Sequence, residues 1–116
     1  MRMALMAIAS VSVLMACGSS FPPPTDQYAA AEKDLGRAQE GGAAAVPDAK
    51  LHLQLAQEDL AKAKELMDKD NQRAASLISR ASAEAELSLN LSKQAQAQAQ
   101  AQQAMDLLSK AKGGNQ

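Results

Sequence analysis

The chain has few side chains that could carry out chemistry, and their spacing does not bring them together. It contains one cysteine, Cys17, and one histidine, His52. A single thiol cannot close an intrachain disulfide, and one thiol with one imidazole makes no metal site, so neither a metal nor another cofactor is expected. His52 lies between two leucines on a predicted helix with no nucleophile at helical spacing, so it is not expected to act as a catalytic base.

The carboxylates offer no better catalytic pair. Glu84 and Glu86 are two positions apart on a predicted helix and therefore do not face each other, while Glu58 and Asp59 are expected on an exposed surface. No glycine-rich phosphate loop is present. The 12 basic and 13 acidic side chains give a net charge of −1, which favours no nucleic-acid partner. The sequence therefore predicts a protein that is not an enzyme, with no evident small-molecule substrate.

The segment that contains Cys17 has the layout of a secretory signal. Arg2 is followed by an uncharged apolar run over residues 3–16, which is shorter than the roughly 20 residues that span a bilayer. Leu14, Met15, Ala16 and Cys17 together resemble the lipobox of bacterial lipoproteins. A plain cleaved signal with an incidental cysteine is the alternative.

The lipobox resemblance implies that residues 1–16 are a signal peptide cleaved between Ala16 and Cys17, and that Cys17 carries the lipid anchor. In lipoproteins of Gram-negative bacteria, Gly18 and Ser19 at these positions favour the outer membrane, and the helical part is then expected to face the periplasm. Two or three acyl chains hold a protein on a membrane effectively for good, because each buried methylene contributes about 0.8 kcal/mol. Residues 17–25 include three consecutive prolines and predict an extended tether that lifts the folded part off the membrane by about 3 Å per residue.

The remainder predicts an all-α fold. We expect helices over residues 26–40, 47–69 and 71–112, then a flexible tail over residues 113–116. Gly41 and Gly42 end the first helix, and Pro47 suits the first turn of the second. The short turn after residue 69 predicts an antiparallel hairpin, preceded by the shorter first helix. The third helix is much longer than the second, so part of it is expected to protrude.

Apolar residues recur in steps of three and four along the hairpin, which is the pattern of a helix-packing seam. The leucines at 51, 55, 66, 77, 87 and 91 are expected to widen this seam. Alanine is the dominant apolar residue and only Phe21 and Tyr28 are aromatic, so close helix contacts are favoured over a deep ligand cavity. The predicted seam consists of Leu53, Ala56, Leu60, Ala63 and Met67 on one helix and Ala74, Ile78, Ala81 and Ala85 on the other.

The same region carries a recognisable pattern of small and apolar residues with a polar break. Its members are Gly42, Ala43, Val46, Pro47, Leu51, Ala56, Leu60, Ala63, Asp70, Ala74, Leu77, Ala81, Ala83, Glu84 and Leu87. On these residues, the chain over residues 26–92 resembles a family of helical proteins, the domain of unknown function forty-three ninety-eight. That family consists of proteobacterial lipoproteins and envelope proteins and brings no assigned activity.

These observations favour a membrane-anchored helical protein that acts as a structural or adaptor module of the cell envelope, with another envelope protein or a second copy of itself as its partner. The alternative is a self-associating spacer between outer membrane and cell wall, similar to the murein lipoprotein. In that protein a terminal lysine is joined to peptidoglycan, whereas Gln116 occupies the last position here, so covalent attachment is not expected.

Overall fold

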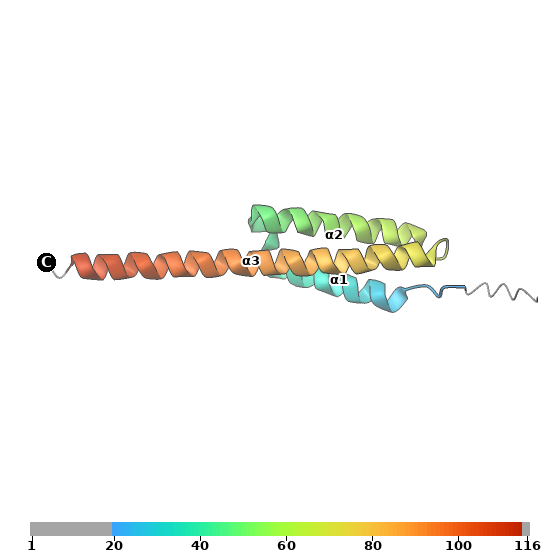
Figure 1. The fold of residues 1–116 in the computed structure, drawn as a ribbon, viewed down its shortest axis with the longest axis horizontal. Coiled ribbons are helices and arrows are strands. Elements are labelled where there is room, and N and C mark those ends of the chain that lie inside the picture. Colours follow the sequence, from blue (N-terminus) through green and yellow to red (C-terminus); the bar gives the residue numbers. More distant parts are fainter. Residues whose placement is uncertain (1–19, 115–116) are drawn as a thin grey trace, which may run out of the picture.

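The three predicted helices are all present in a computed structural model, which describes residues 20–114 (Figure 1). Helix α1 spans Thr25–Glu40, a short 3₁₀ turn η1 spans Ala43–Ala45, α2 spans Pro47–Leu66, and α3 spans Asn71–Gly113. No strand occurs among the described residues. The prediction of an all-α fold with a long third helix is therefore confirmed.

Helix α3 is the central element, and both other helices pack along its N-terminal half (Figure 1). Helix α2 runs antiparallel to α3, as the hairpin prediction requires, whereas α1 runs parallel to α3. Contacts of α1 are mainly with α3 and fewer with α2. The first helix thus lies against the hairpin instead of standing apart from it.

The core is built largely from alanines that are completely buried. Leu60 and Ile78 form one cluster with Ala31, Ala63 and Ala81, and Leu53 forms a second cluster with Ala38, Ala43 and Ala49 near the start of α2. Because a methyl group occupies little space, helices that meet through alanine can pack closely. The alanines with no exposed surface are Ala31, Ala38, Ala43, Ala49, Ala56, Ala63, Ala74 and Ala85.

The connection between α1 and α2 is held by polar groups of α3. Gly42 adopts a φ of +82°, a left-handed conformation that favours glycine. The Gly41 carbonyl accepts hydrogen bonds from Ser92 Oγ at 2.5 Å and from Gln96 Nε2 at 2.9 Å. These two bonds attach the connection between α1 and α2 to residues 92–96 of α3, where the packed part of the bundle ends.

The turn between α2 and α3 begins earlier than the sequence predicts. Helix α2 ends at Leu66, so residues 67–69 lie outside the helix predicted over 47–69. The physical reason is that Met67 is extended and Asp68 has a φ of +70°. Asp68 N–H donates to Asn71 Oδ1, and the Asp70 side chain accepts from Arg73 N–H, which caps α3.

Two backbone groups at the end of the predicted tether, which is expected over residues 17–25, are bound to the helices, while residues 17–19 lie outside the described part of the chain. Pro24 is buried, and its carbonyl accepts the Tyr28 N–H at 2.9 Å at the start of α1. The Phe21 carbonyl accepts a hydrogen bond from Asn71 Nδ2 at 2.8 Å. A spacing of 50 residues between these partners hides this contact from local sequence patterns.

Candidate functional site

The residues of the predicted seam lie between α2 and α3, with one exception. Met67 is only partly buried and lies just beyond the end of α2. Cys17 and the predicted cleavage site after Ala16 lie outside the described residues. The seam residues that the structure buries are Leu53, Ala56, Leu60, Ala63, Ala74, Ile78, Ala81 and Ala85.

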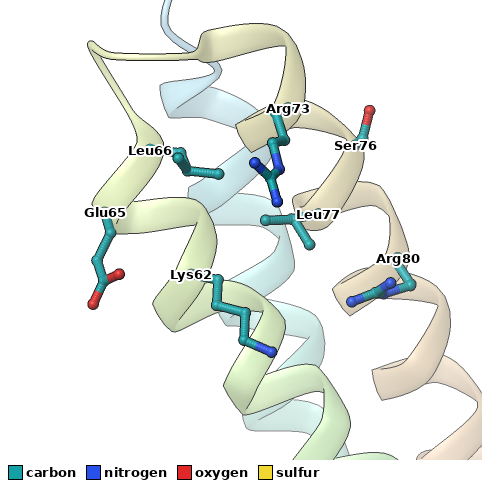
Figure 2. Close-up of a pocket in the computed structure, with 7 residues that line it drawn as sticks. All are labelled: Lys62, Glu65, Leu66, Arg73, Ser76, Leu77 and Arg80. Carbon is teal, nitrogen blue, oxygen red and sulfur yellow. The ribbon is translucent and has the colours of Figure 1, made fainter.

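An open groove of about 520 Å³ lies between α2 and α3, near their connecting turn. Figure 2 shows Leu66 of α2 and Leu77 of α3 facing each other, with cationic side chains around them. The residues that line it are Lys62, Glu65, Leu66, Arg73, Ser76, Leu77 and Arg80. Positive and negative charges both border this groove, and it forms no enclosed pocket.

One cation of this groove is already neutralised by a buried carboxylate. Asp59 is only 3% exposed, and both of its carboxylate oxygens accept hydrogen bonds from the Arg80 guanidinium. The expectation that Asp59 lies on an exposed surface is therefore wrong. Asp59 lies three positions after Ala56 and four before Ala63, which are both seam residues. This helical spacing places Asp59 on the same face as the seam, and it is the sequence feature that indicates burial.

His52 also has a partner that sequence spacing does not reveal. Its Nδ1 lies 2.5 Å from Glu84 Oε2, and because a carboxylate accepts hydrogen bonds, Nδ1 is the donor. The side chains of His52 and Glu84 are 26% and 23% exposed. This pair joins α2 to α3.

Three leucines expected to widen the seam are exposed instead. Leu51 and Leu55 of α2 and Leu87 of α3 are 54%, 37% and 42% exposed. Helix periodicity places these residues beside the seam, but only contact with a third helix would cover them. Because α1 packs on another side of α3, they remain in solvent.

The C-terminal part of α3 has no helix beside it. Every residue from 97 to 114 is exposed, and we call this segment the arm. At 1.5 Å per residue the helical part of the arm measures about 25 Å. It carries three large apolar side chains, Met105, Leu107 and Leu108, which are 58%, 67% and 61% exposed.

Among residues 20–114, no three His, Cys, Asp or Glu side chains gather in a way that could hold a metal ion. The same part holds no helix with the length and apolar character needed to cross a bilayer. No known protein family, curated protein or solved structure matches this chain.

Proposed function

We propose that this protein is a lipoprotein of the bacterial outer membrane, anchored through Cys17, whose helical bundle presents the arm to another envelope protein. The anchor rests on the lipobox-like segment that ends at Cys17. The binding role is supported by the exposure of every residue from 97 to 114, nearly all of them on one continuous helix. The role is binding and not catalysis.

The arm has the properties of a helix that is bound by a partner. An isolated helix of this length is marginal in water, but α3 is already nucleated inside the bundle, so the arm only propagates it. Met105 and Leu108 are three positions apart and share one face of the helix. Such an apolar face suits a hydrophobic groove on a partner.

A second candidate function is self-association, and the spacing of apolar residues in the arm favours it. Alanine and leucine recur there in steps of four, three, four and three, as in a coiled-coil seam. Copies paired through this face would form the spacer that resembles the murein lipoprotein. The face consists of Ala97, Ala101, Ala104, Leu108 and Ala111.

The anchor is tested by comparing the wild type with Cys17→Ala in a Gram-negative host. The wild-type protein is expected in the membrane fraction with a mass that includes acyl chains, and its processing is expected to stop with an inhibitor of lipoprotein signal peptidase. Cys17→Ala should lose both the lipid and the membrane fraction. A wild-type protein without lipid would refute the anchor.

The binding role is tested with a photocrosslinking residue at Met105 in living cells, with Gln54 on the outer side of α2 as the matched exposed control. A protein partner is supported if a crosslink to a different protein forms from Met105 but not from Gln54. This crosslink should be lost when Leu108 is changed to Asp. A product of twice the monomer mass supports self-association. Equal products at both positions, or none at Met105, would contradict both functions.

A further inference from the structure

The end of the bundle nearest to the lipid anchor is defined by a side-chain contact. Asn71, the first residue of α3, donates from Nδ2 to the Phe21 carbonyl, and Pro24 is buried at the start of α1. The Phe21 backbone is thereby held next to the turn between α2 and α3. The start of the described chain and this turn lie at the same end of the molecule (Figure 1).

The length of chain that separates this end from the anchor is short. Phe21 follows Cys17 by four residues. Whatever their conformation, four residues span at most about 14 Å, because a fully extended chain covers about 3.3–3.6 Å per residue. An acyl group on Cys17 therefore keeps Phe21 within that distance of the lipidated residue, and the hydrogen bond from Asn71 keeps the turn between α2 and α3 next to Phe21.

We infer that the turn between α2 and α3 is the membrane-facing end of the molecule, that the Phe21 ring enters the headgroup layer, and that the arm points away from the lipid surface. This inference rests on the proposed anchor at Cys17. Phe21 is 46% exposed although its carbonyl is bound, so its ring is available to lipid. Phe is among the residues that interfacial segments bury at the boundary between headgroups and acyl chains.

The charges near the turn indicate which forces hold this end on the membrane. Lys69 and Arg73 are balanced by Asp68 and Asp70 within the same few residues. A balanced surface gains little from anionic lipid, in contrast to the roughly 1 kcal/mol that each unbalanced Lys or Arg contributes near such a surface. We therefore expect the acyl chains and Phe21 to hold this end on the membrane without anionic lipid, and a zwitterionic membrane is the appropriate probe.

The direction of α3 then places the arm far from the membrane. Leu108 follows Asn71 by 37 positions on one continuous helix, a distance of about 55 Å at 1.5 Å per residue. The arm carries no broad apolar face bordered by Lys and Arg, which is the pattern of helices that lie in the interface. We therefore expect α3 to stand away from the membrane plane, with the arm at its far end.

The test uses the full-length lipidated protein in phosphatidylcholine vesicles that contain headgroup-labelled nitroxide lipid. Once Cys17 Sγ is alkylated, a cysteine introduced by Lys69→Cys or by Ser109→Cys is the one free thiol and takes a fluorophore. We expect the label at position 69 to lose most of its emission and the label at position 109 to lose none. This difference should persist at high salt.

Each other outcome overturns the inference in a distinct way. Loss of emission at both positions means that α3 lies flat, and loss at position 109 alone means the reverse orientation. No loss at either position, while the protein still floats with the vesicles, means that the turn is held off the membrane. Failure to float refutes the anchor itself, which vesicle flotation and the mass of the processed protein establish separately.

The contact between Asn71 and Phe21 is tested by Asn71→Asp. This change keeps an oxygen that accepts the Asp68 N–H, removes the donor to the Phe21 carbonyl, and adds a charge that the N-terminus of α3 tolerates. The label at position 69 should then be quenched less than in the parent, with unchanged helical circular dichroism. In Phe21→Trp, a blue shift of emission on vesicle binding is expected, and no shift would refute the entry of this side chain into the headgroup layer.

Discussion

The ion pair between Asp59 and Arg80 predicts an unusual order of mutational effects, in which loss of the exposed partner costs more than loss of the buried one. The Asp59 side chain is 5% exposed and the Arg80 side chain is 59% exposed. When Arg80 is truncated, the buried carboxylate loses both of its hydrogen-bond donors. When Asp59 is truncated, the guanidinium simply returns to solvent.

The expected magnitudes follow from these two environments. Arg80→Ala should destabilise the fold by about 2 kcal/mol, because a buried acceptor left without a partner costs about 1–3 kcal/mol. Asp59→Ala should cost less than about 1 kcal/mol, since it leaves no buried charge and gains up to about 0.7 kcal/mol of helix propensity. After Asp59→Ala, adding Arg80→Ala should change little, so the two changes couple strongly.

Urea unfolding of residues 18–116, followed by circular dichroism, measures these free energies for both single variants and the double variant. The Arg80→Ala effect corresponds to a Tm decrease of about 10 °C for a domain of this size. Arg73→Ala is the matched control, because Arg73 borders the same groove and forms no salt bridge among the described residues. If Asp59→Ala costs as much as Arg80→Ala, or if the two effects add, the account of the pair is wrong.

Three further outcomes are expected. Ending the chain after Gln96 should leave the unfolding free energy unchanged within about 0.5 kcal/mol, because the arm buries nothing, and a larger loss would show contacts that the structure lacks. Ser88→Ala removes the buried hydrogen bond from Ser88 Oγ to the Ala49 carbonyl (2.6 Å) and should cost about 1 kcal/mol, whereas the exposed Ser109→Ala should cost almost nothing. Burial, and then Glu32, raise the pKa of Tyr28 above its ordinary 10.0, so alkaline absorbance should show the one tyrosine ionising later in the folded than in the unfolded chain. This contribution to stability is present below pH 10 and is lost as the pH rises through the pKa of the folded state.

The helices and the residues between α2 and α3 follow from local sequence patterns. Steps of three and four between Leu53, Ala56 and Leu60 place these residues on one face of α2, and the structure buries that face. The glycines at 41 and 42 also indicate where α1 must end. Such features depend on residues within one or two helical turns of each other, so the sequence is sufficient to locate them.

Features that depend on distant residues could not be predicted in the same way. The burial of Asp59 depends on a guanidinium 21 positions away on another helix. The position of the Phe21 backbone next to the turn depends on Asn71, and Leu51 is exposed because α1 packs on a different side of α3. Periodicity states which residues share a face, but it does not state which faces a third helix will cover.

The exposure of the arm followed from the unequal lengths of α2 and α3, and its helical state has a physical reason that bears on binding. Alanine and glutamine are good helix formers, and the packed half of α3 has already met the cost of nucleation. Lys110 and Lys112 in the last turn favour the negative end of the helix dipole. A segment that is helical before it meets a partner loses less conformational entropy on binding than a disordered one. Modest apolar contacts through Met105 and Leu108 can therefore provide useful affinity, which is the physical basis for proposing that the arm is the binding element.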